Sequence, residues 1–507
     1  MEHQTLRLET WKTVCLVVCV ALVVGCITVG PDYEQPEVAV PDAWHTDAVA
    51  GLEVGAAPLE RWWSVLDDPD LDDLIARAKV ANLDLRTAVW RVEEARALRG
   101  VAAGAAYPQV DAVGSASRSE PSDNGVLGDL APDGFEAGNL FEVGVGASWE
   151  LDVFGRIRRT VESADAALEA DIEAYRDVLV SLLSEVASAY VDLRTTQERL
   201  RLARNNVNIQ NNTLSLTQDR FRVGLVSGLD VAQAEAILAS TEALIPQLRT
   251  QRELAMNRLA VLLGAVPGSL HDELLEPRPI PHEPEQATVG LPADLLRQRP
   301  DVRRAERSLA AQTARIGIAT ADLYPSFSLT GYLGLEAVDG SDLFGSDSTT
   351  WSFGLPVRWA IFSGGRIRSQ IRAEEARTEQ ALVAYEQAVL RALEEVENSL
   401  YAYGEELSRR DHLRDTVDAT ERSLDLVMTQ YRSGLTNFQN VLDTQRSLLN
   451  RQDELAASEG QVTQNLIAVY RALGGGWDPE EVPVPSVEDD GRAAAETAEG
   501  TDEPGSA

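Results

Sequence analysis

The stretch FRVGLVSGL at residues 221–229 has a counterpart in YRSGLTNFQ at residues 431–439. Each stretch contains an aromatic residue, an arginine, one variable residue and Gly-Leu, and each follows a long run of helical character. A glycine at the end of such a run is typical of a helix terminus. Two similar helix ends, 210 positions apart, indicate that the chain contains an internal repeat.

The repeat extends far on both sides of these turns. Residues 155–264 align with residues 365–474 at a constant offset of 210, without a gap, and GRIR at 155–158 recurs at 365–368. A segment farther upstream repeats as well, at an offset of 217, so that Tyr107-Pro108 matches Tyr324-Pro325. Each half therefore reads as a helix, a Tyr-Pro pair, an alternating region, GRIR, a long helix, a turn and a second long helix. The chain is a tandem duplication.

The long helical segments have a sustained 3.5-residue period, which is typical of coiled-coil packing. From Gly155 to Gly224 there are about 70 residues, which corresponds to roughly 100 Å of helix at 1.5 Å per residue. Polar and small residues dilute the apolar positions, which favours helices packed side by side in a wall over helices around a dry core. In the first copy the positions are Leu182, Val186, Ala189, Leu193, Thr196, Leu200, Ala203, Val207, Gln210, Leu214, Thr217 and Phe221.

Four segments alternate between apolar and polar residues and are predicted to be strands. The pattern is strong in residues 141–152 and 351–361 and weaker in 107–117 and 324–334. One apolar face over about ten residues, with aromatic residues near the ends, is typical of a strand in a membrane barrel. A strand of a soluble sandwich with one solvated face is the alternative. Trp149, Trp351 and Trp359 are predicted to form the aromatic girdle at the membrane boundary.

Four strands cannot close a membrane barrel by themselves, because such barrels have eight or more strands and an open edge is not tolerated in lipid. The pattern therefore predicts a barrel shared between subunits. Two subunits give eight strands, whose interior fills with side chains, whereas three give twelve strands with room for an aqueous lumen. A conduit favours three subunits.

The N-terminus predicts export and lipidation. Arg7 and Lys12 precede a short apolar run that ends at Cys26, as in a secretory signal peptide. The stretch VVGC at 23–26 resembles a bacterial lipobox, which implies acylation of Cys26. An ordinary signal or an anchor helix with an incidental cysteine is the alternative. By the sorting rules for lipoproteins, Ile27 in place of an aspartate implies the outer membrane.

Composition excludes several functions. The formal net charge of −36 argues against a nucleic acid partner. Ten acidic residues and one arginine in residues 478–507 predict a disordered tail. No P-loop, Gly-x-Ser-x-Gly motif or Cys/His cluster is found, so the sequence predicts neither an enzyme nor a metal site.

Three stretches resemble one known family, the outer-membrane factors or TolC-like exit ducts, and especially their lipoprotein branch (NodT/OprM-type). CITVGPDYEQPEVAVPDAW (26–44) is similar to the lipidated N-terminal arm of that branch. GLPADLLRQRPDVRRAERSLAAQTARIGIATADLYPSFSLTG (290–331) is similar to its central motif. The turns at 221–229 and 431–439 resemble its two hairpin tips. The resemblance covers about residues 26–477.

The resemblance implies a mainly helical homotrimer with a membrane β-barrel. Long antiparallel coiled-coil helices would form a trimeric α-barrel tunnel across the periplasm, continuous with a 12-stranded β-barrel to which each subunit gives four strands. Such a duct has no cofactor apart from the lipid on Cys26. Its implied partners are a periplasmic adaptor (membrane fusion) protein, an inner-membrane pump, expected to be proton-driven, and outer-membrane lipid. The implied function is passive efflux of small molecules or drugs.

The resemblance also assigns residues to roles. The implied adaptor contacts are Arg222, Gly224, Leu225, Arg432, Gly434 and Leu435, although the two glycines are also explained as helix ends. The implied periplasmic gate consists of Asp443, Asn440 and Gln439. Asn440 departs from the family pattern, in which an acid stands there, and Gln439 replaces an apolar residue. In the other copy, Asp230 and Gln233 have the i, i+3 spacing of a capping box.

The expected organisation is given by residue ranges: a signal peptide (1–25), an extended lipidated arm (26–64), a helical segment (65–106), strand pair 1 (107–152), helical hairpin 1 (153–264), a linker (265–290), a helical segment (291–323), strand pair 2 (324–362), helical hairpin 2 (363–474) and an acidic tail (478–507). Two other functions remain open at this point. One is the exit channel of a type I protein exporter or of a metal-ion exporter, and the other is a non-transporting trimeric coiled-coil surface lipoprotein.

Overall fold

The computed structural model describes residues 27–45, 52–54, 59–120, 122, 137–284, 287–289, 298–480 and 483–484. The signal peptide, Cys26 and most of the acidic tail lie outside the described residues. The chain divides into two compact units. The first comprises Met1–Pro36, Glu94–Ala170 and Glu306–Ala384, and the second comprises Glu37–Glu93, Asp171–Ala305 and Tyr385–Ala507.

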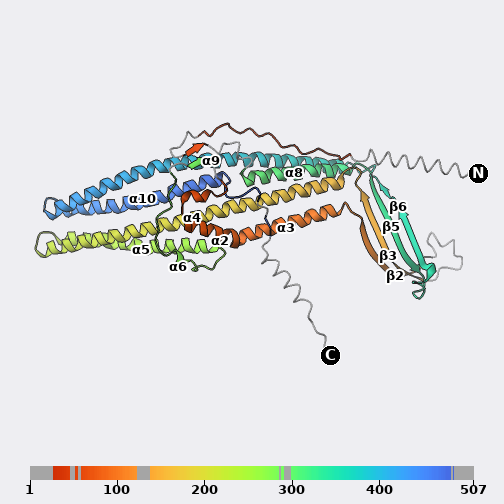
Figure 1. The fold of residues 1–507 in the computed structure, drawn as a ribbon, viewed down its shortest axis with the longest axis horizontal. Helices are drawn as coiled ribbons and strands as arrows, with labels where there is room; N and C mark the ends of the chain where they lie inside the picture. Colours follow the sequence, from red (N-terminus) through yellow and green to blue (C-terminus); the bar gives the residue numbers. More distant parts are fainter. Residues whose placement is uncertain are drawn as a thin grey trace, which may run out of the picture. The chain divides into compact units, whose positions relative to one another are not determined.

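The first unit contains one antiparallel sheet. Its strands are β2 (Gln109–Ser119), β3 (Gly138–Leu151), β5 (Ser326–Ala337), β6 (Thr349–Gly354) and the short β7 (Val357–Arg358). The strand order is β2-β3-β5-β6, and β7 also pairs with β5 (Figure 1). Within the described part of the chain, β2 and β6 therefore each leave one edge without a partner strand.

The register places one apolar face on all four strands. Ala112, Val145, Leu333 and Trp351 lie opposite one another across the sheet. The next row, on the other face, consists of Asp111, Gly146, Tyr332 and Ser352. Because side chains alternate between the faces of a strand, this register separates apolar from polar residues throughout the sheet.

The strand predicted at 351–361 is interrupted. It forms β6 and β7, with Leu355 and Pro356 between them. Proline has no N–H to donate to a neighbouring strand, which explains the break. The carbonyl of Pro356 still accepts a hydrogen bond from the backbone N–H of Ser328 at 3.1 Å, so both pieces stay beside β5.

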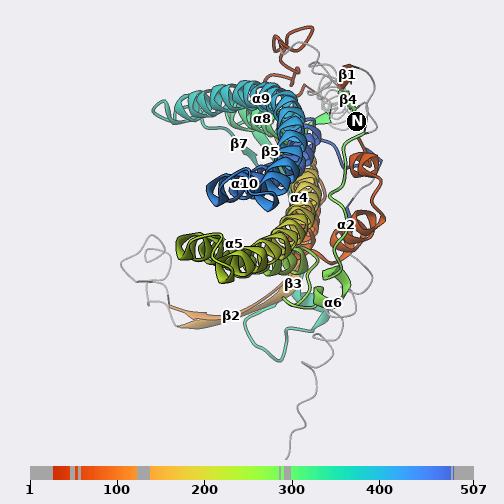
Figure 2. The ribbon, with the colours of Figure 1, turned by 90° about the vertical axis from the view of Figure 1, so that its left-hand side faces the viewer.

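Four long helices reproduce the duplication. α4 (Arg156–Arg222) and α9 (Arg366–Arg432) each have 67 residues, and α5 (Gly228–Leu262) and α10 (Phe438–Ala472) each have 35. At 1.5 Å per residue, α4 and α9 are each about 100 Å long. Within the second unit, seen along the helix axes, the α4–α5 and α9–α10 hairpins lie next to each other in a curved layer (Figure 2).

The predicted stripe of α4 is confirmed only in part near its C-terminal end, because Gln210 and Thr217 are buried as expected but Phe221 is not. There the buried side chains are Asn206, Gln210, Thr213 and Thr217, whereas Phe221 is 49% exposed. These polar residues face α10, as the hydrogen bond from Gln445 Nε2 to Thr213 Oγ1 at 2.7 Å shows. A helix in a layer has neighbours on two sides, so its most buried stripe need not be its most apolar one.

The second unit also contains the shorter elements η1 (Trp62–Leu66), α2 (Pro69–Ala81), α6 (His271–Leu274) and a parallel pair formed by β1 (Leu52–Val54) and β4 (Ala287–Val289). The helices α3 (Leu83–Gly104) and α8 (Pro300–Ala321) precede β2 and β5, and η4 (Ser346–Ser348) precedes β6. Trp62 is fully buried and stacks on Tyr470, with ring centroids 5.6 Å apart, which fixes η1 on α10.

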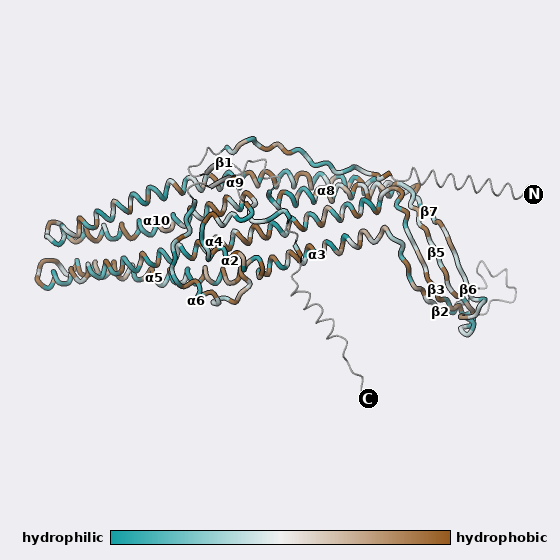
Figure 3. Tube along the Cα trace, in the orientation of Figure 1, coloured by the Kyte–Doolittle hydropathy of each residue, from teal (hydrophilic) through white to brown (hydrophobic). Residues whose placement is uncertain are grey.

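Hydrophobic and hydrophilic residues are interspersed along the long helices (Figure 3). Among the helices of the described residues, none has an apolar stretch of the length and character needed to cross a bilayer.

Candidate functional sites at the helix tips and the strand–helix junction

The two tip turns, residues 221–229 and 431–439, have the same backbone geometry. Gly224 and Gly434 have φ values of +76° and +75°. The N–H of Leu225 donates to the carbonyl of Arg220 at 2.9 Å, and the N–H of Leu435 donates to that of Gln430 at 2.8 Å. This pattern ends a helix with a left-handed glycine. The structural explanation of both glycines therefore holds, whatever else contacts them.

The predicted adaptor contacts are accessible. Leu225 and Leu435 are 66% and 79% exposed, and Arg222 and Arg432 are exposed beside them. A Cβ added to Gly224 would meet no atom within 4 Å, so its glycine is required by the backbone angle and not by crowding within the chain. The turns thus present exposed leucine and arginine side chains on rigid helix ends.

A compact apolar cluster lies directly behind the tips and joins the two hairpins. Arg220, at the end of α4, places its guanidinium 4.5 Å from the ring centre of Tyr431 on α9 and donates to the Tyr431 carbonyl. Tyr431 in turn packs against Phe438 at 5.7 Å. The buried members of this cluster are Ala234, Ile237, Tyr431, Phe438, Val441 and Leu442.

The sequence did not single out Arg220 or Tyr431. The difference between the two copies could have drawn attention to them. The duplication places Gln430 at the position of Arg220 and Phe221 at the position of Tyr431. Arg220 and Tyr431 each differ from their counterparts in the other copy, and these two residues contact each other.

The predicted gate residues form one exposed polar strip at the start of α10. Gln439 Nε2 donates to both carboxylate oxygens of Asp443, at 2.9 and 3.1 Å. Asn440 Nδ2 donates to Thr436 Oγ1 at 2.7 Å. The strip lies beside the buried cluster, and its side chains make these contacts within their own helix end.

The first tip has the capping box, with a different partner from the one expected. The backbone N–H of Ser227 donates to Asp230 Oδ2 at 2.9 Å. The box therefore pairs Ser227 with Asp230, and the predicted Asp230–Gln233 pairing is wrong. The N-cap residue, just before α5, is Ser227 and not Asp230. In the second copy, Asn437 accepts a hydrogen bond from the N–H of Asn440 at 3.3 Å.

At the other end of the long helices, two predicted girdle residues make equivalent contacts. The indole N–H of Trp149 donates to the carbonyl of Ala106 at 2.9 Å, and that of Trp359 donates to the carbonyl of Leu323 at 3.0 Å. Both bonds join the start of one strand of a pair to the end of the other. Trp351 lies farther along β6 and is 74% exposed on the apolar face.

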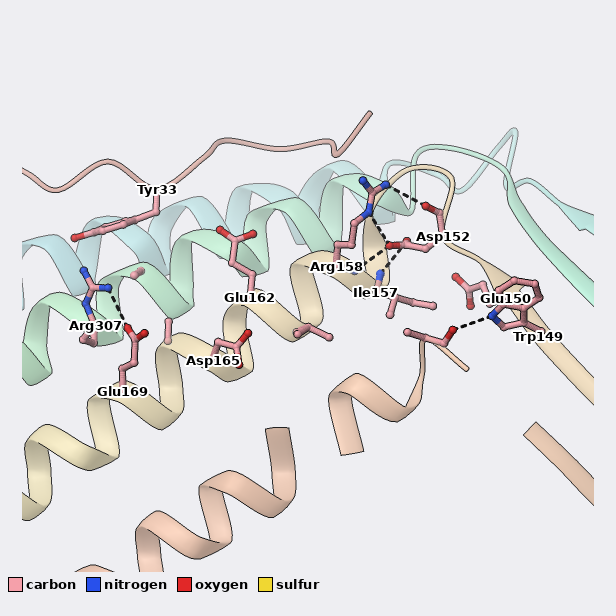
Figure 4. A pocket seen from close by; sticks show the side chains of 14 residues that line it. Tyr33, Trp149, Glu150, Asp152, Ile157, Arg158, Glu162, Asp165, Glu169 and Arg307 are labelled. Carbon is pink, nitrogen blue, oxygen red and sulfur yellow. Dashed lines mark hydrogen bonds and ion pairs between the residues drawn. The ribbon is translucent and has the colours of Figure 1, made fainter. Parts of the chain in front are cut away.

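A pocket of about 590 Å³ lies beside Trp149 and is lined by Tyr33, β3, α4 and α8 (Figure 4). Its charged groups are engaged with one another. Arg307 pairs with Glu169 at 3.0 Å and Asp165 pairs with Arg99 at 2.7 Å. These contacts join α8 and α3 to α4 and leave little charge for a ligand.

The N-terminal arm is fixed at the same junction. The N–H of Val29 donates to the carbonyl of Phe154 at 3.2 Å, and the buried Arg159 donates to Val29 O at 3.1 Å and to Asp32 at 2.7 Å. Gly30, with φ +87°, packs so closely on Gly317 that a Cβ would lie 2.4 Å from its Cα. These contacts fix Val29 and Gly30, which follow Cys26 closely in the sequence, next to the end of β3 and the helices α4 and α8.

A family model described as outer membrane efflux protein matches residues 74–265 and 291–475. The chain belongs to this family. Nodulation protein T of Rhizobium leguminosarum bv. trifolii is 32% identical over 459 residues, which are 90% of this chain and 96% of that protein. The toluene efflux pump outer membrane protein TtgF of Pseudomonas putida is 32% identical over 471 residues, covering 90% of this chain and 95% of that protein.

Solved structures of outer membrane efflux channels have the same fold. The outer-membrane channel OprN matches with a TM-score of 0.83 and 38% identity, over 89% of this chain and 100% of that chain. The open state of the Neisseria gonorrhoeae MtrE outer membrane channel matches with a TM-score of 0.73 and 29% identity, over 91% of this chain and 100% of that chain. The fold class predicted from the sequence is confirmed, as is its assignment to the efflux channels of the outer membrane.

Proposed function

We propose that this chain is the exit duct of a tripartite efflux system, which conducts small molecules passively through the outer membrane. The observation that carries the proposal is a four-stranded sheet with an apolar face and two open edges, joined to helices of 67 residues. Helices of about 100 Å are long enough to cross much of the periplasm. The family to which the chain belongs consists of outer membrane efflux proteins.

The assembly that fits this subunit is a homotrimer. Three sheets joined edge to edge give twelve strands, satisfy every edge in lipid and leave an aqueous lumen. The apolar face, which includes Trp149, Trp351 and Trp359, then faces lipid, with aromatic residues at the boundary.

The partners follow from the two ends of the long helices. The exposed Arg222, Leu225, Arg432 and Leu435 offer a surface to a periplasmic adaptor protein, which receives cargo from an inner-membrane pump. TtgF is named as part of a toluene efflux pump, which favours small organic molecules as cargo here. The fixed arm supports acylation of Cys26, because Val29 and Gly30, which follow Cys26 closely in the sequence, are held beside Phe154 and Gly317 near the strand ends.

Conductance in a planar bilayer tests the proposal. We expect the purified trimer to form pores, and Asp443→Ala to raise their conductance, because three Asp443 side chains would line the entrance in the resting trimer. Asp230→Ala is the matched control, since its carboxylate caps α5, and it should leave conductance unchanged. A trimer that forms no pore would contradict the duct, and an unchanged Asp443→Ala pore would return Asp443 to a structural role.

A further inference from the structure

The GRIR motif begins both long helices, but its two copies have different electrostatic surroundings. In the first copy, Arg156 binds the carboxylate of Glu150 with both its Nε and Nη2, the former at 2.9 Å. Arg158 binds Asp152 at 3.1 Å, and the same carboxylate accepts the N–H groups of Ile157 and Arg158. Both arginines of the first copy are therefore neutralised by carboxylates at the end of β3.

The second copy lacks both carboxylates. The offset of 210 places Ala360 at the position of Glu150 and Phe362 at the position of Asp152. It also places Arg358 at the position of Ser148. The second copy has thus lost two negative charges and gained one positive charge around the same motif, in a chain whose formal net charge is −36.

Arg358 and Arg366 line the same pocket, of about 340 Å³, between the strand ends and the helix starts of the first unit. Neither side chain has a hydrogen bond or ion pair with any of the described residues. The carboxylates that also line the pocket act on the first copy: Glu150 binds Arg156, Asp152 binds Arg158, and Asp322 lies within the electrostatic field of Arg156.

The pocket is lined by residues of the polar face of the sheet, among them Glu150, Ser326 and Arg358. Arg358 pairs with Ser326 in the register, and Ser326 belongs to the row of polar residues that continues with Ser328 and Thr330. In the trimer of the proposed function, on which this step rests, that face lines the lumen and the apolar face meets lipid. Two unpaired arginines per subunit then lie where the strands meet the helices.

We propose that Arg358 and Arg366 form an anion site at this junction, which takes a phosphate or carboxylate group of a small molecule in transit. Arginine binds such groups with charge-assisted, often bidentate hydrogen bonds. The site would give the duct a preference for anionic cargo at one level of an otherwise acidic protein. A lipid phosphate has the same chemistry and is the other possible source of the bound group.

Binding of inorganic phosphate to the full-length trimer in detergent, measured by calorimetry, tests the site without requiring conduction. We expect Arg358→Ser combined with Arg366→Ala to weaken phosphate binding by at least about tenfold, as the loss of charged hydrogen bonds predicts. Ala360→Glu should have a similar effect, because it restores the carboxylate that neutralises the equivalent arginine in the first copy. Arg368→Ala, which removes an arginine outside the pocket, is the matched control.

Wild-type protein that binds no phosphate, or variants that bind as well as it does, would overturn the site. Loss of the trimer in the arginine variants would also overturn it, because the arginines would then pair with carboxylates of a neighbouring subunit.

Pore measurements separate the two sources of the anion. For an anion in transit, phosphate should reduce wild-type conductance, and the double variant should shift the reversal potential in a KCl gradient toward cation selectivity. Co-purified phospholipid that is lost in the double variant, with an unchanged reversal potential, would overturn transit in favour of a lipid. A pore without any phosphate effect contradicts the site and leaves the duct intact, whereas phosphate binding without conduction contradicts the duct and leaves the site.

Discussion

Arg220 connects the two hairpin tips, because it extends from α4 to Tyr431 on α9. It covers the ring of Tyr431 and donates to the Tyr431 carbonyl, which also accepts the N–H of Gly434 at 3.0 Å. We expect Arg220→Ala to lower the free energy of local opening around residues 431–438 by about 2 kcal/mol, from the lost cation–π contact and the lost charged hydrogen bond. Amide hydrogen exchange of this segment measures the change.

Arg222 provides the matched control for Arg220. It lies two residues away and is exposed, with an ion pair only to Asp219 of its own turn among the described residues. Arg222→Ala should leave hydrogen exchange unchanged and weaken adaptor binding. If both variants change exchange equally, the contact with Tyr431 does not stabilise the tips.

Asp301 makes the stability of the second unit depend on pH. Burial raises the pKa of Asp301, but its bidentate pair with Arg299 and the N–H of Val302 outweigh this, so the net shift is downward from 3.8. The folded state thus favours the carboxylate, and its contribution to stability is present above pH 3.8 and lost as the pH falls through the lower folded value. Arg299 also donates to the carbonyl of Ala472, so the pair connects α8 to α10.

We therefore expect Asp301→Asn to lower the urea midpoint at pH 7 and the difference from wild type to shrink at pH 3. Circular dichroism at the two pH values gives the measurement. Asp73→Asn is the control, because Asp73 is paired with Arg77 at the surface and exposed pairs contribute little. If the difference between the urea midpoints of wild type and Asp301→Asn grows on acidification, the downward pKa shift assigned to Asp301 is wrong.

Among the helices, α10 approaches α4 so closely at Gly460 that the packing requires a glycine. A Cβ there would lie 2.1 Å from Thr195 Oγ1 and 3.0 Å from Thr195 Cβ. Gly460→Ala should destabilise the protein by about 1–3 kcal/mol, because overpacking outweighs the gain in helix propensity. Gly100→Ala in α3, where a Cβ meets nothing within 4 Å, should instead stabilise it by up to about 1 kcal/mol.

Thermal unfolding compares the two alanine variants. The double variant Gly460→Ala/Thr195→Ala should recover part of the lost stability, because it removes the side-chain atoms of Thr195 that the new methyl group would meet. Equal effects of alanine at positions 460 and 100 would show that helix propensity alone determines the change in stability, and would contradict the close contact with Thr195.

The elements were predictable where one local pattern determines them. The period of α4 and α9 persists over 67 residues, and the alternation of β3 over 14, so neither depends on a distant contact. The break at Pro356 follows from a missing N–H and could have been predicted from the sequence.

The candidate sites were less predictable, because they depend on which segments meet in space. No periodicity shows that Arg220 lies over Tyr431, that Gly460 faces Thr195, or that the buried stripe of α4 becomes polar near its tip. For the GRIR arginines, the sequence shows the duplication, but only the structure shows that Glu150 and Asp152 neutralise one copy. The roles of Asp443, Cys26 and the exposed tip residues remain predictions.

For the whole molecule, the helices are stabilised by contacts within one chain, whereas the strands need neighbouring subunits. This difference predicts the order in which the two kinds of structure are lost on denaturation. The helical hairpins have buried contacts within one chain, such as the cluster at Tyr431 and Phe438. The sheet, by contrast, leaves an edge of β2 and an edge of β6 to be satisfied by neighbouring subunits. In a membrane or detergent micelle these backbone groups have no other partner.

Dissociation of the trimer and loss of strand structure should therefore occur in one transition, and loss of helix in a later one. A titration with SDS, followed by native mass and by the amide I infrared band, measures both. We expect the mass to fall from three chains to one as the strand component disappears, while most of the helical component persists. A monomer that keeps its strand signal would contradict the shared barrel, because its four strands would then be stable with both edges open.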